Sequence, residues 1–173
     1  LLLTGTGSLS VEGGYEDAVH SKGELTVESG SYTLTASHNA LNGKTALTVT
    51  GGSFTITAAE DALHSKGDLE VSDGSITISA GDDALHSDKT LTVKGGTIRI
   101  SQCNEGLEGM TVNVSGGEIT VNSSDDAVNG SGETEDGTEA KISVNISGGS
   151  LKIVTGGDGI DSNGDLNISG GTI

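Results

Sequence analysis

Residues 61–80 read DALHSKGDLEVSDGSITISA, and this block recurs along almost the whole chain. Successive positions equivalent to Asp61 are 22 residues apart four times and then 21 and 32 residues apart. They are Asp17, Asn39, Asp61, Asp83, Glu105, Asp126 and Asp158. A period of this length is too short for helix-pair repeats and too regular for chance. The chain is therefore predicted to be a solenoid whose turns pack on their neighbours.

Five positions of the block are apolar in nearly every copy. In the copy quoted they are Leu63, Leu69, Val71, Ile76 and Ile78, and polar residues alternate with them inside each short run. This alternation, with many β-branched residues, is typical of half-buried strands. We predict that the five columns form the core throughout, including the last copy. There the matching residues are Ile160, Leu166, Ile168 and Ile173.

Three short strands in each block, with corners at Lys-Gly, at Gly-Gly and at an acidic pair, predict an all-β parallel β-helix of six to seven turns. The composition of 29 glycines and no proline fits strands that keep every ladder donor and corners that need flexible backbone. We predict one domain over residues 1–173, because a solenoid buries one continuous core. One acidic insertion, residues 131–141, interrupts the array and carries Glu133, Glu135, Asp136 and Glu139.

The chain has a formal net charge of -17, with 25 acidic and 8 basic residues. This charge argues against binding to nucleic acid or to anionic membranes, both of which it would repel. Cations are the expected partners. The sequence starts without Met and contains neither a signal peptide nor an apolar stretch of membrane-spanning length. We therefore expect an excised, monomeric part of a longer protein.

The corner that carries the acidic pairs should place acids directly above acids on successive turns. Two interpretations remain open. Asp and Asn side chains at a turn can bond nearby backbone N–H groups and form a ladder without any metal. Alternatively, stacked carboxylates and corner carbonyls could supply the 6 to 8 oxygen ligands of calcium. The candidate calcium ligands are Glu16, Asp17, Glu60, Asp61, Asp82, Asp83, Asp125, Asp126, Asp158 and Asp161.

A histidine column follows the acidic corner, and it contains His20, His64 and His86. Stacked His and Asp can bind zinc or nickel, but such sites need three or four convergent ligands and this column offers two adjacent histidines on an outward face. We favour a hydrogen-bonding surface that meets a polar ligand. Tyr15 is the one aromatic residue outside the core columns and the candidate platform for a sugar ring.

The block from Asp61 to Ala80 resembles the repeats of secreted bacterial carbohydrate-binding domains, which have the form DGIHSKGDLxISGGTITITA. These domains are right-handed parallel β-helices similar in fold to pectate lyases. The opening from Leu3 to Val11 resembles the run that precedes their first full turn, so the resemblance covers essentially the whole chain. It implies calcium at the acidic corners, a secreted or cell-surface location, and binding of plant cell-wall polysaccharide, both cellulose and acidic sugars such as pectate. This chain departs from the pattern where Ala replaces Gly, as at Ala62, and at the turns with His38-Asn39 and Asn104-Glu105.

A lyase of this fold would use calcium to acidify a sugar and an Arg or Lys to remove its proton. The single arginine, Arg99, falls on the third strand of its block and away from the acidic corner. We therefore predict a non-catalytic, calcium-dependent module that binds acidic polysaccharide. A cell-surface adhesin or stalk, with calcium as a structural ion, is the alternative, and a calcium-dependent lyase is less favoured.

Overall fold

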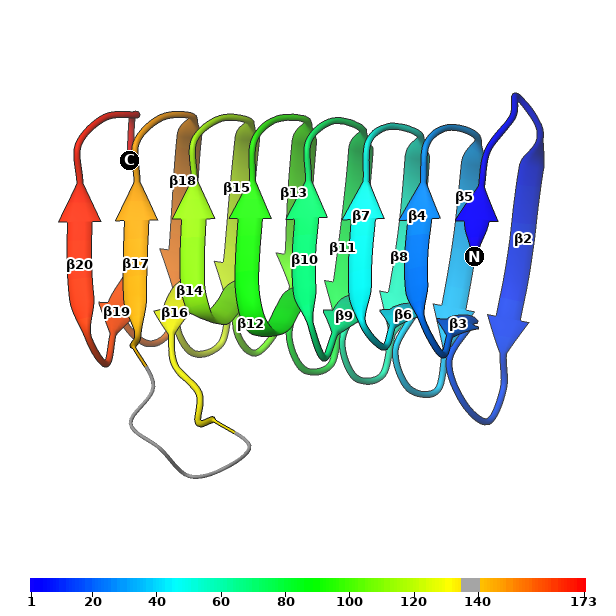
Figure 1. Ribbon diagram of the computed structural model, residues 1–173, viewed down its shortest axis with the longest axis horizontal. Coiled ribbons are helices and arrows are strands. Elements are labelled where there is room, and N and C mark those ends of the chain that lie inside the picture. The colour runs from blue at the N-terminus through cyan, green and yellow to red at the C-terminus, as the bar shows by residue number, and fades with distance from the viewer. Residues whose placement is uncertain (135–140) are drawn as a thin grey trace.

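The computed structural model describes residues 1–134 and 141–173, and the chain forms a parallel β-solenoid of about seven turns. In Figure 1 the strands of the near layer run upward, the chain crosses over the top, and the strands of the far layer run downward. The turns advance from right to left, which makes the coil right-handed. The predicted fold class is therefore confirmed.

Each full turn has three strand positions. The first holds β3 (Val19–Ser21), β6 (Leu41–Gly43), β9 (Leu63–Ser65), β16 (Val128–Gly130) and β19 (Asp161–Ser162). The second holds β1 (Leu2–Leu3), β4 (Glu24–Val27), β7 (Ala46–Val49), β10 (Asp68–Val71), β17 (Ser143–Ile146) and β20 (Asp165–Ile168). Two longer strands, β12 (Leu85–Val93) and β14 (Leu107–Val114), run through both positions. The third holds β2 (Ser8–Gly13), β5 (Ser31–Ala36), β8 (Ser53–Ala58), β11 (Ser75–Ala80), β13 (Thr97–Gln102), β15 (Glu118–Ser123) and β18 (Ser150–Thr155).

The strand register follows the sequence repeat. Strand β9 pairs in parallel with β12 so that Leu63 lies beside Leu85, and β11 pairs with β13 so that Ile76 lies beside Ile98. The third-position strands form a seven-stranded sheet, and the other described strands form a second sheet of 13. Like residues therefore stack from turn to turn, as the columns of the sequence predict.

The five apolar columns meet in the space between the two sheets, and most of their members are fully buried. Burying a Leu, Ile or Val side chain in this way stabilises the fold by about 1.5–3 kcal/mol. The last turn departs from the prediction, because Leu166, Ile168 and Ile173 are 47%, 52% and 56% exposed. These residues have a neighbouring turn on one side, so half of the stack that buries the same columns elsewhere is missing.

The corner after the second strand position needs glycine. Gly74, for example, has φ of 117°, a left-handed conformation that side chains disfavour. Among the residues described, no helix has the length and apolar character needed to cross a membrane. The predicted insertion falls between β16 and β17, and its Glu135, Asp136 and Glu139 lie outside the described residues.

Candidate functional site

The second residue of most acidic pairs belongs to a ladder along the solenoid. Its side-chain oxygen Oδ1 accepts the backbone N–H of the equivalent residue one turn further on. Asn39 accepts from Asp61 at 3.1 Å, Asp61 from Asp83 at 3.1 Å, and Asp83 from Glu105 at 3.3 Å. Asn39, Asp61 and Asp83 are at most 8% exposed. The ladder satisfies backbone donors at a corner where strand pairing stops.

Asn39→Ala removes the acceptor of the Asp61 N–H, and a buried donor left without a partner costs about 1–3 kcal/mol. We expect a lower free energy of unfolding in urea, whereas Asn39→Asp, which keeps the oxygen, should lose less. Equal stability of the Ala variant and the wild type would show that the ladder does not contribute.

The second oxygen of a ladder residue often meets the histidine column. Asp17 Oδ2 accepts from Asn42 Nδ2 at 2.8 Å and lies 3.0 Å from His20 Nδ1. Glu105 Oε2 likewise accepts from Asn129 Nδ2 at 2.9 Å. Asn42 and Asn129 hold the position of the histidine column on other turns. The histidine column therefore does not simply face outward, since several residues at its position turn toward the acidic ladder. The two columns are parts of one polar network.

The first residue of each acidic pair points to solvent instead. Glu16 and Glu60 are exposed, and His38 on the intervening turn lies 3.6 Å and 3.5 Å from their carboxylates. Asp82 and Asp125 are exposed as well. The two carboxylates of one pair thus diverge. Calcium needs 6 to 8 oxygens around one point, and these pairs do not converge in that way.

The most concentrated part of the network surrounds His86. Its Nδ1 lies 3.2 Å from Asp83 Oδ2, 3.5 Å from Asp61 Oδ2 and 3.5 Å from Glu108 Oε2. These carboxylates come from three successive turns. Burial alone would lower the pKa of His86, but the carboxylates of Asp61 and Asp83 outweigh burial and raise that pKa to about 11. Burial raises the pKa of Asp83 to about 8.

A pocket of about 500 Å³ opens beside this cluster. Its walls come from the corner before β10, from β12 and β14, and from the chain that follows β16. They bring together two lysines, the edge of His86 and the chain's single methionine. The wall residues include Lys66, His86, Asp88, Lys89, Glu108 and Met110. The pocket thus offers two lysines, three carboxylates (Asp88, Glu108 and Glu133), further hydrogen-bonding groups and one apolar side chain.

Comparison with known proteins identifies the family of this chain. The family model described as "Carbohydrate-binding domain-containing protein" matches residues 1–135, which include the ladder from Asn39 to Glu105 and all the lining residues of the pocket. The chain belongs to this carbohydrate-binding domain family. The match covers most of the solenoid.

A solved structure has the same fold as this carbohydrate-binding domain. It is a polysaccharide lyase-like protein from C. thermocellum, described as a gadolinium derivative. The TM-score is 0.51 at 18% sequence identity, and the alignment covers 99% of this chain and 89% of the other. At that identity the likeness concerns the fold. No curated protein matches the chain in sequence.

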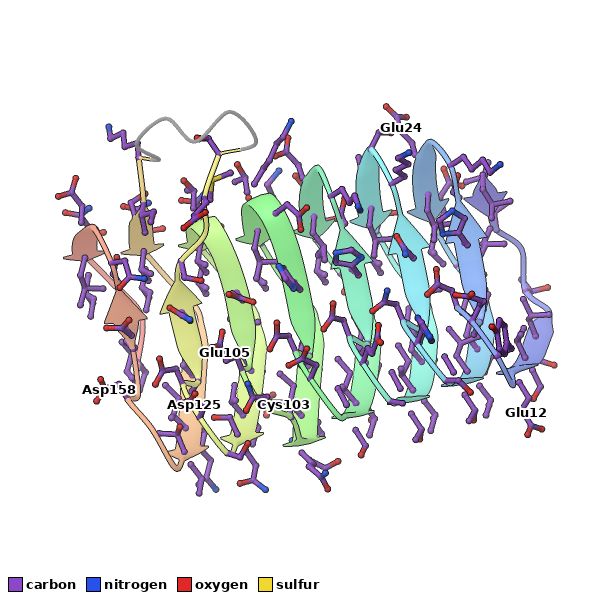
Figure 2. All side chains as sticks on the ribbon, turned by 90° about the horizontal axis from the view of Figure 1, so that it is seen from below. Glu12, Glu24, Cys103, Glu105, Asp125 and Asp158 are labelled. Atoms are coloured by element: carbon purple, nitrogen blue, oxygen red, sulfur yellow. The ribbon has the colours of Figure 1, made fainter. Side chains whose placement is uncertain are left out.

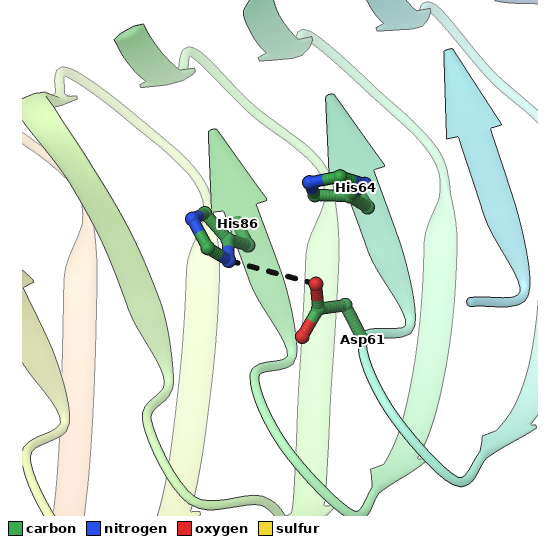
Figure 3. A group of neighbouring side chains, drawn as sticks. All are labelled: Asp61, His64 and His86. Atoms are coloured by element: carbon green, nitrogen blue, oxygen red, sulfur yellow. Dashed lines mark ion pairs between the residues drawn. The ribbon is translucent and has the colours of Figure 1, made fainter. Parts of the chain in front are cut away.

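The residues predicted from the sequence fall in several places on the domain. Asp61, Asp83, His64 and His86 come together in one cluster, as Figure 3 shows for three of them. Tyr15 is 83% exposed in the chain between β2 and β3, at the N-terminal end of the coil. Seen from below in Figure 2, Asp125 and Asp158 lie on one side of the coil toward its other end. The remaining candidates are Glu16, Asp17, His20, Glu60, Asp82, Asp126 and Asp161, spread along the same polar edge.

Sequence reasoning missed five residues of this region. Glu108 was visible as a member of the histidine column, and its column position could have suggested its contact with His86. Lys66, Asp88, Lys89 and Met110 gave no such signal. They come from different turns, and the pocket that unites them depends on the chain after β16.

Proposed function

We propose that this domain is a non-catalytic polysaccharide-binding module for acidic glycans, with the pocket beside His86 as its binding site. The observation that carries the proposal is the position of Lys66 and Lys89. Two of the chain's eight basic residues line this one pocket of a protein with a net charge of -17. Lysines placed there would pair with the carboxylates of uronic-acid residues, and such charged contacts are stronger than neutral ones.

The other pocket residues suit the rest of a sugar. Asp88 and Glu108 can accept hydrogen bonds from hydroxyl groups, and Met110 offers an apolar surface to the C–H face of a ring. Sugar binding by stacking would have to use Tyr15, which lies several turns away. Flat binding to crystalline cellulose is therefore less favoured than binding to a soluble acidic chain.

Calcium enters this proposal as a bridging ion. The exposed carboxylates of Glu60 and Asp82 lie on adjacent turns at the acidic corner. This corner precedes the first strand position, and the pocket borders the other end of these strands. They supply too few oxygens to hold calcium tightly by themselves. Carboxylates of a bound glycan would complete the coordination and would be drawn toward a surface that otherwise repels them.

We propose binding without cleavage because the matching family model describes a carbohydrate-binding domain and because the chain's only arginine does not line the pocket. Arg99 on β13 is exposed and pairs with Glu118 at 3.3 Å. A location outside the cell, in a secreted or cell-surface protein, is part of the same proposal, since acidic polysaccharides of cell walls are found there.

Affinity electrophoresis of the chain through gels that contain polygalacturonate, neutral glucan or no polymer tests the proposal. We expect retardation by polygalacturonate that calcium strengthens and a chelator weakens, with little change of the melting temperature in the absence of glycan. Migration unchanged by every polymer would favour a stalk or adhesin instead. Accumulation of unsaturated oligosaccharides in the polygalacturonate samples would show a lyase and overturn the non-catalytic part.

A further inference from the structure

Two histidines and a carboxylate meet at the edge of the pocket. His64 on β9 and His86 on β12 are register partners, and their ring centroids are 5.3 Å apart. Asp61 lies beside them and points its carboxylate at His86 (Figure 3). Potential ligand atoms of these three residues all lie within 4.8 Å of one another. Asp83, His86 and Glu108 form an overlapping set with the same property.

The donor atoms decide which cations such a site suits. Calcium and magnesium take oxygen ligands, whereas imidazole nitrogen suits zinc, nickel, cobalt and copper. Among residues 1–134 and 141–173, each convergent set of three His, Cys, Asp or Glu ligands includes His86. We propose that Asp61, His64 and His86 bind one divalent transition-metal ion, typified by zinc, at the edge of the pocket.

The charge around the site favours a dication. His86 alone offsets the carboxylates of Asp61 and Glu108 within the described part of the chain, where neither forms an ion pair with Lys or Arg. A divalent ion that replaces the proton of His86 would balance more of this negative charge. Metal binding and protonation of His86 are therefore alternatives for one position.

A second observation concerns His64, whose side chain is only 12% exposed. Its Nδ1 is buried and has no hydrogen-bond partner among the described residues. Its Nε2 lies 3.6 Å from Asp88 Oδ1, and His86 Nε2 lies 3.6 Å from the same oxygen. Buried imidazole nitrogens normally have hydrogen-bond partners. The Nδ1 atom of His64 has none among the described residues, so His64 has a ring nitrogen that the protein leaves unused. Asp88 lines the pocket, which gives an ion a path of entry.

The metal site can be tested without any glycan, so a negative result would not affect the proposed function. Zinc chloride is titrated into chelator-treated, ¹⁵N-labelled protein, and the imidazole resonances are followed by NMR. The four histidines to compare are His20, His38, His64 and His86. We expect saturation at one equivalent, with shifts confined to His64 and His86. Shifts at His20 or His38 alone, or no saturable shift, would overturn the proposal and leave the proton on His86.

Variants give an independent measurement by calorimetry. His64→Gln should weaken zinc binding at least about 100-fold, because a directly coordinating residue should matter at least as much as an outer partner. His20→Gln is the matched control, since His20 holds the same column position two turns away. Zinc affinity that is equal in both variants, or calcium that displaces zinc at equal concentration, would contradict the assignment.

Discussion

Replacement of both pocket lysines, Lys66→Gln with Lys89→Gln, should reduce the affinity for an oligogalacturonate about 100-fold. Each lysine is expected to contribute about 1.4 kcal/mol through a charge-assisted contact with a sugar carboxylate, and 1.4 kcal/mol corresponds to a factor of ten. Isothermal titration calorimetry at low salt measures the loss directly. The wild-type affinity should also fall as salt is added, because both lysines are solvent-exposed.

Lys22→Gln is the matched control for that experiment. Lys22 holds the same corner position as Lys66 two turns earlier, is also exposed, and does not line the pocket. Its removal changes the net charge by the same single unit as removal of Lys66. If the control weakens binding as much as Lys66→Gln alone, the lysines act only through overall charge and the pocket is not the site.

Gly67→Ala should destabilise the domain by about 3 kcal/mol, in the upper range for overpacking of a close contact. A Cβ at Gly67 would lie 1.9 Å from the carbonyl oxygen of Thr45 on the neighbouring turn, and a backbone atom cannot move aside cheaply. Gly67 also follows Lys66 directly, so the shift would disturb the pocket wall. Thermal unfolding followed by circular dichroism should show a melting temperature lower by about 6–12 °C.

Gly23→Ala makes the corresponding change at the same corner of an earlier turn. No atom lies within 4 Å of a Cβ placed there, so we expect a change within about 0.5 kcal/mol. If both variants unfold at the wild-type temperature, the close approach of successive turns does not require glycine at position 67.

The repeat predicts most of the fold because, in a solenoid, residues one repeat apart in the sequence lie side by side on successive turns. Each column position contacts its own equivalent one turn away, as the pairing of Leu63 with Leu85 shows. Burial of the columns then follows from alternation inside each strand. The prediction failed at Leu166 and Ile168, where a column member has one neighbouring turn and remains exposed.

The site was predictable only in part. The acidic pairs and the histidine column were visible, but sequence adjacency does not reveal which residue of a pair turns inward. Asp83 accepts the ladder hydrogen bond while Asp82 points to solvent, and this difference depends on the backbone rotation at the corner. The convergence of carboxylates from three turns on His86 also could not be predicted without knowing how the strands of successive turns are aligned. Met110 and the lysines could be joined to the site only through the shape of the pocket.

The binding site in the pocket beside His86 can be tested most directly through Met110. It is the single methionine of the chain, so ¹³C-methyl labelling gives one resonance from inside the pocket wall. Trigalacturonate is titrated into the labelled protein while calorimetry follows binding. We predict a saturable shift of this resonance with the affinity that calorimetry gives. Binding by calorimetry with an unmoved Met110 signal would contradict the account and place the glycan elsewhere on the coil.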